Sequence, residues 1–188
     1  MPPAIRLIVA MTGASGAIYG IRALQLLRSQ AVETHLIVSP AAGRTIAQET
    51  GWGLREVEAL AAYVHSPEDV GAAIASGSFI TQGMLVAPCS IKTLSAVANS
   101  YTVNLIVRAA DVCLKEGRPL VLMVRETPLH LGHLRLMATA AEMGAVIFPP
   151  VPAFYSGEQT LDEVVAASVG RALARMGIEN DAYPKWEG

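Results

Sequence analysis

The sequence predicts a doubly wound α/β fold, in which helices cover both faces of a parallel sheet. Three observations support this fold class. Short continuous runs of Val, Ile and Leu alternate along the chain with longer segments of helical periodicity. A glycine-rich segment at residues 12–20 directly follows the first apolar run, and the length of 188 residues suits one domain. We expect one domain over residues 1–188, with 177–188 as a C-terminal tail.

Five apolar runs are expected to form strands, because parallel strands covered on both faces are short and continuously apolar. These runs are residues 5–11, 35–38, 84–87, 120–124 and 145–148. The segments between and after them carry apolar residues at helical spacing. They predict helices over residues 16–29, 41–50, 54–62, 91–98, 105–116, 129–143 and 161–176.

The composition constrains the partners and the compartment. The chain is 52% hydrophobic and only 16% charged, which is too apolar for the surface of a monomer and predicts a homo-oligomer. A net charge of -2 without a Lys/Arg run argues against nucleic-acid binding, which needs a cluster of basic residues. Every apolar stretch is shorter than the roughly 18 residues that span a membrane, and the N-terminal one is too short for a signal peptide. We therefore expect a cytoplasmic protein without membrane insertion.

In parallel α/β sheets ligands bind beyond the carboxyl ends of the strands. The first strand runs into the turn TGASGAIYG, whose backbone amides and helix amino terminus favour an anion such as phosphate. Alternatively, Gly16 and Gly20 only permit close packing of helix against strand. Ser39 ends the second strand, where dinucleotide folds place an acidic residue for the ribose, so NAD is disfavoured.

The third and fourth strands also end in polar residues. Ser90, Lys92 and Thr93 open a helix and could surround a phosphate, although a capping Ser beside a surface Lys explains the same pattern. Arg125 and Glu126 follow the fourth strand, as an anion clamp beside a proton-transferring carboxylate or as a simple ion pair.

Several other reactive residue types have simpler interpretations. Cys89 is expected to be a packing residue, and Cys89 and Cys113 lack the spacing of a disulfide framework or zinc site. His130 and His133 lack the glutamate of a zinc-protease helix and are expected to cap or pack. Glu49 ends a predicted helix, where most glutamates are only solvated. The sequence predicts no metal site.

Taken together, six segments resemble the UbiX family of flavin prenyltransferases, in the family's order and over nearly the whole chain. They are TGASGAIYG, the strand-end Ser39, PCSIKTL at 88–94, RAADVCLKEGRPLVL at 108–122, RETPLHLGHLRLM at 125–137 and PPVPAFY at 149–155. The resemblance implies a flavodoxin-like homododecamer that joins a dimethylallyl group from dimethylallyl phosphate to reduced flavin mononucleotide (FMN) without a metal. It also implies that the prenylated FMN serves a partner UbiD-type decarboxylase, in ubiquinone biosynthesis or aromatic acid breakdown.

The resemblance further implies roles for individual residues. The residues implicated in proton handling, and hence catalysis, are Ser15, Glu49 and Glu126. Flavin contacts are implied for Gly13, Ala14, Ser15, Ser39, Ser90, Ile91, Lys92, Thr93 and Arg125. Substrate contacts are implied for Lys115, Arg125, Tyr155, Arg171 and Trp186. Periodicity alone points instead to Arg175 or to neither arginine, because Arg175 lies nearer the centre of the apolar stripe of the last helix than Arg171 does.

The sequence departs from the family pattern at two places. Gly117 in LKEGRP replaces a positive charge, and the loop at residues 156–158 lacks the usual basic and proline residues.

Three other functions are alternatives to prenyl transfer. A flavin-dependent cysteine decarboxylase of the same fold needs an active-site histidine, and none falls in the glycine turn or at a matched strand end. A short-chain dehydrogenase is disfavoured by Ser39, and a non-enzymatic flavin carrier would return its flavin unaltered.

Overall fold

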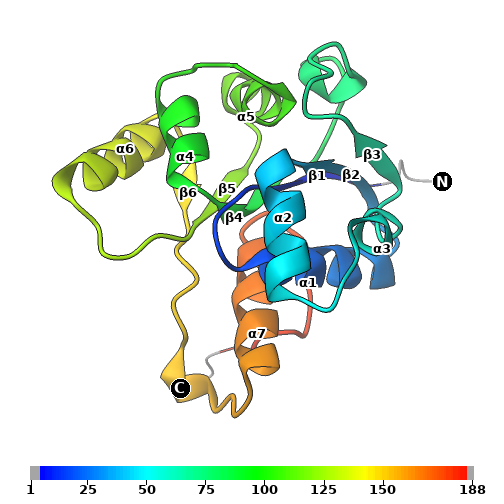
Figure 1. Ribbon diagram of the computed structural model, residues 1–188, viewed down its shortest axis with the longest axis vertical. Helices are drawn as coiled ribbons and strands as arrows, with labels where there is room; N and C mark the ends of the chain where they lie inside the picture. Colours follow the sequence, from blue (N-terminus) through cyan, green and yellow to red (C-terminus); the bar gives the residue numbers. More distant parts are fainter. Residues whose placement is uncertain (1–4, 186–188) are drawn as a thin grey trace.

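The computed structural model describes residues 5–185 and has a six-stranded parallel sheet at its centre (Figure 1). The strand order is β3-β2-β1-β4-β5-β6, so the chain first winds outward from β1 in one direction and then in the other. This arrangement confirms the predicted doubly wound fold. The strands are β1 (Arg6–Met11), β2 (Glu33–Val38), β3 (Tyr63–His65), β4 (Met84–Cys89), β5 (Leu120–Val124) and β6 (Val146–Ile147).

Helices cover both faces of the sheet and bury two apolar clusters against it. The residues of β1 alternate between the clusters: Leu7 and Val9 pack on the α1, α2 and α7 side, and Ile8 and Ala10 pack on the α4, α5 and α6 side. The helices are α1 (Ala17–Ser29), α2 (Pro40–Glu49), α3 (Leu54–Glu58), α4 (Ile91–Ala98), α5 (Leu105–Lys115), α6 (Leu131–Glu142) and α7 (Leu161–Ala174), with short 3₁₀ turns η1 (Ala73–Ala75) and η2 (Phe154–Ser156).

All five predicted strands and all seven predicted helices are present, and the main error is at one edge of the sheet. The helix expected over 54–62 ends at Glu58, and the chain turns into β3, a strand that the sequence did not reveal. Tyr63 and Val64 are about half exposed, because an edge strand needs no continuous apolar run.

Glycine sets the distance between α1 and the sheet. A Cβ atom on Gly20 would lie 2.4 Å from the carbonyl oxygen of Ala87 and 2.7 Å from Cγ of Met11. Helix α1 therefore packs directly on the backbone of β4, as the close-packing interpretation expected for Gly20. Gly16 has a different role, since it caps α1 with a φ of 101°, a conformation that L-residues rarely adopt.

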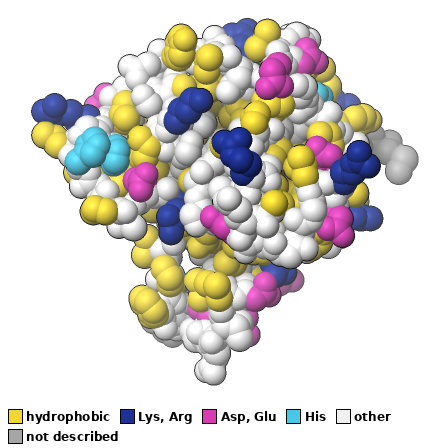
Figure 2. Space-filling view, viewed as in Figure 1, with side chains coloured by type: hydrophobic (Ala, Val, Ile, Leu, Met, Phe, Trp, Pro, Cys, Tyr) yellow, Lys and Arg dark blue, Asp and Glu magenta, His cyan; other side chains and the backbone are white. Residues whose placement is uncertain are grey.

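The segment between β6 and α7 leaves the body of the molecule and carries exposed apolar side chains. It runs through η2 and forms, with the start of α7, the lower protrusion in Figure 1. Val151, Phe154 and Leu161 are 73%, 92% and 78% exposed, and hydrophobic side chains gather on this protrusion in Figure 2. Exposed apolar patches of this kind are typical of interaction surfaces. Within residues 5–185, no helix is both long and apolar enough to span a membrane.

We expect Gly20→Ala to destabilise the protein by about 2 kcal/mol or more, because the new methyl group overlaps backbone and Met11 atoms. The control is Gly43→Ala within α2, where a Cβ would meet nothing closer than 3.7 Å and the better helix propensity should stabilise by about 0.5–1 kcal/mol. Urea unfolding at one fixed protein concentration measures both. Equal effects of the two substitutions would contradict the close approach.

Candidate functional site

The loops after β1 and β4 are held together by the hydroxyl group of Thr12. Its Oγ1 donates to the carbonyl oxygen of Pro88 at 2.7 Å and accepts from the backbone N–H of Ser90 at 2.8 Å. Thr12 is almost fully buried, so neither bond competes with water. The ends of the two central strands are thus fixed side by side. The sequence marked Thr12 only as the end of a strand and gave no sign of this bridge.

The amino terminus of α1 is occupied by a carboxylate of the protein itself. Oε2 of Glu49, at the end of α2, accepts hydrogen bonds from the backbone N–H groups of Gly16 at 2.7 Å and Ala17 at 3.2 Å. Gly16 offers no side chain to cap the helix, so Glu49 supplies the missing acceptor. The interpretation of Glu49 as merely solvated is therefore wrong. The anion at this helix terminus is a side chain, and these two amides are not available to a phosphate.

The surroundings of Glu49 keep its carboxylate ionised. Burial acts to raise the pKa of Glu49, but hydrogen bonds from the Gly16 amide, the Ser15 hydroxyl and the Ala17 amide, with the charge of Arg125, outweigh it and lower the pKa. Ser15 after β1, Glu49 at the end of α2 and Arg125 after β5 are thus brought within electrostatic reach of one another. An ionised carboxylate hydrogen-bonded to a hydroxyl can accept a proton through it.

A cavity of about 390 Å³ lies beside this cluster, between the amino termini of α2 and α4. Its walls include five of the predicted flavin contacts: Gly13, Ser39, Ser90, Lys92 and Thr93. Ser39 accepts from the N–H of Ala42 at 3.1 Å and Ser90 from that of Thr93 at 3.3 Å, so both serines are N-caps as well as cavity residues. The capping interpretation of Ser90 is therefore confirmed, and its contact with a phosphate stays a prediction.

The donor set of this cavity suits a phosphate group. The amides of Ile91 and Lys92, the first two of α4, have no hydrogen-bond partner within residues 5–185. Two helix amino termini, the serine hydroxyls and the Lys92 ammonium add positive potential and donors at the same place. These donors are of the kind that bind a phosphate group at a helix amino terminus.

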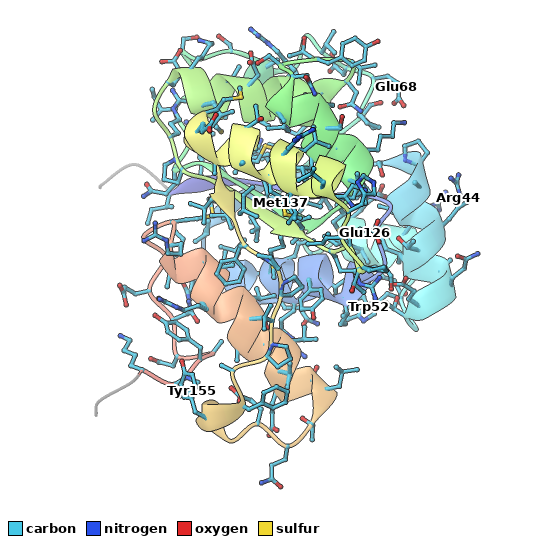
Figure 3. The ribbon with its side chains drawn as sticks, turned by 90° about the vertical axis from the view of Figure 1, so that its left-hand side faces the viewer. Arg44, Trp52, Glu68, Glu126, Met137 and Tyr155 are labelled. Carbon is cyan, nitrogen blue, oxygen red and sulfur yellow. The ribbon has the colours of Figure 1, made fainter. Side chains whose placement is uncertain are left out.

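Arg125 and Glu126 stand at the end of β5 as predicted. The N–H of Arg125 donates to the carbonyl oxygen of Cys89 at 3.1 Å, which fixes the residue beside the end of β4. No salt bridge joins Arg125 to Glu126 in the described part of the chain, so the ion-pair alternative is not observed. Both side chains are exposed, and Figure 3 shows Glu126 on the side of the molecule where α2 lies.

The predicted substrate contacts do not all meet within one chain. Lys115 ends α5, pairs with Glu116 and precedes β5, so it lies at the edge where the strands begin. Tyr155 lies on the protrusion, well apart from Glu126 (Figure 3). Trp186 lies outside the described residues.

The two candidate arginines of α7 differ in their surroundings. The guanidinium of Arg171 lies 5.7 Å from the centre of the Tyr183 ring, and Arg171 also lines a cavity of about 90 Å³ with Phe148 and Val151. Arg175 is exposed and follows the last helical residue. Arg171 thus lies within α7 and Arg175 just beyond its end, and the choice between them as the phosphate contact stays a prediction.

The other reactive residues are accounted for by packing and capping. Cys89 is fully buried, which raises the pKa of its thiol to about 12, so its interpretation as a packing residue is confirmed. Nδ1 of His130 accepts from the N–H of Gly132 at 3.0 Å and caps α6, as expected. His35 of β2 and His65 of β3 hydrogen-bond to each other at 2.9 Å. Among residues 5–185, no three His, Cys, Asp or Glu side chains gather in a way that would hold a metal ion.

A parallel sheet with this cavity at its carboxyl edge is the arrangement of a flavin-binding protein. A family model described as Flavoprotein matches residues 1–172, and the chain belongs to that family. Within it, the chain groups with the flavin prenyltransferases called UbiX. It is 59% identical to UbiX of Salmonella typhimurium over 186 residues, 97% of this chain and 98% of the relative. The resemblance found in the sequence is thereby confirmed.

Solved structures agree with this grouping. The complex of AnUbiX with FMN and dimethylallyl pyrophosphate is 48% identical, with a TM-score of 0.97 over 99% of each chain. A dodecameric FMN-dependent UbiX-like decarboxylase from Escherichia coli O157:H7 is 48% identical, with a TM-score of 0.95 over 98% of this chain and all of that one. The cysteine decarboxylase TvaF, 15% identical over 94% of this chain and all of that one with a TM-score of 0.66, shares the fold alone.

The lowered pKa of Glu49 predicts a pH-dependent contribution to stability. Since its folded-state pKa lies below its unfolded value of about 4.3, the contribution is complete above that pH and is lost as the pH falls through the folded-state pKa. We expect Glu49→Ala to lose about 1 kcal/mol at pH 7, because solvent screens the exposed charge. Urea unfolding of both proteins from pH 7 to pH 3 should show the difference shrinking at acid pH. A constant difference would refute the electrostatic role.

Proposed function

We propose that this protein is a flavin prenyltransferase, which transfers a dimethylallyl group from dimethylallyl phosphate to reduced FMN. The observation that carries the proposal is the 59% identity to UbiX along 97% of the chain. The phosphate-compatible cavity beside Ser15 and Glu49 supports it from the geometry. The AnUbiX complex, which contains FMN together with dimethylallyl pyrophosphate, supports a flavin and a prenyl donor side by side.

We assign the flavin phosphate to the cavity between α2 and α4, and the ring to the loop that carries Gly13, Ala14 and Ser15. The carboxylate of Glu49 supports this orientation, because it would repel a phosphate at the amino terminus of α1. Ser39, Ser90, Ile91, Lys92 and Thr93 then donate to the phosphate end.

In the proposed reaction, the bond between the allylic carbon and the phosphate oxygen breaks, and the phosphate leaves with the electron pair. Reduced FMN supplies the electron-rich nitrogen and aromatic carbon that take up the prenyl group. Arg125 stabilises negative charge at the site, and the Ser15–Glu49 hydrogen bond handles a proton near the ring. When the second bond forms, one alkene carbon of the attached prenyl group bonds to the aromatic carbon and the other takes up a proton, and Glu126 would accept the proton that the aromatic carbon then loses.

Several copies of the chain are needed to complete the site as we propose it. Lys115 lies at the edge where the strands begin and Tyr155 lies on the protrusion (Figure 3), both away from the end of β5 that carries Arg125 and Glu126, so we infer that they reach the phosphate site from different copies. The exposed apolar protrusion and the dodecameric relative support such an assembly. We infer that the assembly of this chain is a dodecamer, because the UbiX-like relative from Escherichia coli O157:H7 is dodecameric.

We further infer that the prenylated FMN is handed to a UbiD-type decarboxylase in the cytoplasm, in keeping with the family resemblance. A cysteine decarboxylase remains the main rival. It is disfavoured because the four histidines lie outside the loop of Gly13–Ser15: two pair beside β3 and two stack at the start of α6.

The product decides between an enzyme and a flavin carrier. Anaerobic incubation with reduced FMN and dimethylallyl phosphate, without metal, should yield a flavin heavier by one five-carbon unit, detected by mass spectrometry. A parallel sample with dimethylallyl pyrophosphate identifies the accepted donor. Unchanged flavin mass in both samples, with bound FMN confirmed, would refute prenyl transfer.

The shared site predicts complementation between two inactive variants. Glu126→Gln removes proton transfer, worth about 10²- to 10⁴-fold in rate, and Lys115→Ala removes a charge that we assign to a neighbouring copy. Each variant alone should be strongly impaired while it still binds FMN. When the two are dissociated and reassembled together, about a quarter of the sites receive both intact residues from different copies, and activity should recover to that extent.

The control for complementation is a mixture of Glu126→Gln with Glu49→Gln. We place both carboxylates at the site within one chain, so this mixture restores no complete site. Recovery in the control mixture, or none in the test mixture, would contradict the assignment of Lys115 to another copy.

A further inference from the structure

We propose that Arg44 sets the preference of this site for a phosphorylated flavin, by placing a guanidinium on the phosphate end of the cavity between α2 and α4. This inference rests on the proposed function, since it takes FMN as the ligand. It concerns a residue outside the pattern by which the chain resembles its family.

The position of Arg44 on α2 directs it to the cavity. Arg44 lies four residues after Pro40 and three after Ala41, so the three share one face of the helix, and all three line the cavity. Long side chains in helices lean toward the amino terminus, which here is the end that faces Ser90 and Lys92. Figure 3 shows Arg44 projecting from α2, and Figure 2 shows Lys and Arg side chains over α2 and toward α4.

The charges around the cavity are of one sign. Arg44 and Lys92 are the two cationic residues in its described walls, and none of the described lining residues is acidic. Neither side chain forms a salt bridge within residues 5–185. A guanidinium without a carboxylate partner retains its donors for a phosphate, to which it can bind through two parallel hydrogen bonds.

Arg44 differs in function from the other groups of the cavity. Apart from the Lys92 ammonium, the other donors of the cavity are uncharged, including the backbone amides of Ile91 and Lys92 and the hydroxyl groups of Ser39 and Ser90. They can donate to any acceptor, including a ribityl hydroxyl group. A guanidinium contributes mainly when its ligand carries charge, and a phosphate monoester carries nearly two negative charges at neutral pH. Removing Arg44 should therefore weaken the binding of FMN but leave the binding of riboflavin nearly unchanged, because riboflavin has the same ring and ribityl chain without the phosphate.

The test is a binding cycle of two ligands and four proteins, read by quenching of flavin fluorescence. We expect Arg44→Gln to lower the affinity for FMN roughly three- to tenfold, because a charge contact at a partly exposed site has this strength. Riboflavin affinity should change less than about twofold. Arg44→Lys should keep most of the FMN affinity. Arg28→Gln, an exposed charge change at the far end of α1, should alter neither ligand.

Added salt should reduce the FMN difference between wild type and Arg44→Gln, since ions screen an exposed contact. Equal weakening of FMN and riboflavin would assign Arg44 a merely structural role, and an unchanged FMN affinity would show that it does not meet the phosphate. Either result overturns the inference. The proposed function is tested by a different result. It would be refuted if the wild-type protein binds FMN more tightly than riboflavin but leaves the mass of the flavin unchanged.

Discussion

The site depends on one interaction, the carboxylate of Glu49 at the amino terminus of α1. Through it, the last residue of α2 closes onto the turn after β1, across 33 residues of sequence. The contact uses amides that would otherwise attract a phosphate, fixes the turn that carries Ser15, and keeps an ionised base there. It thereby separates two regions at one sheet edge: the turn at α1, for which we propose proton handling, and the cavity between α2 and α4, for which we propose phosphate binding.

Two further constraints keep these regions in place. The buried Thr12 hydroxyl joins the loops after β1 and β4, which both contribute to the walls of the cavity. Gly20 lets α1 lie directly on the sheet, which positions the helix whose amino terminus Glu49 caps. The cavity thus rests on rigid elements, which suits the binding of a cofactor in a defined orientation.

The arrangement also explains why so apolar a chain forms a stable protein. Its core fills both faces of the sheet, and apolar side chains remain on the protrusion formed by η2 and the start of α7. In the proposed assembly this surface is buried between copies. The same contacts bring together the cationic residues that one chain holds apart, so packing and substrate binding depend on the same interfaces.

The sequence determined the alternation of strands and helices, because burial on both faces leaves continuous apolar runs and helical periodicity leaves stripes. It also marked Ser39, Ser90 and Arg125 as candidate site residues, since they lie at or just beyond the ends of predicted strands. Only the tertiary structure revealed the Thr12 bridge, the cap by Glu49, the edge strand β3 and the place of Arg44. Each of these depends on contacts between residues far apart in the chain or on exposure at an edge, for which local pattern carries no signal.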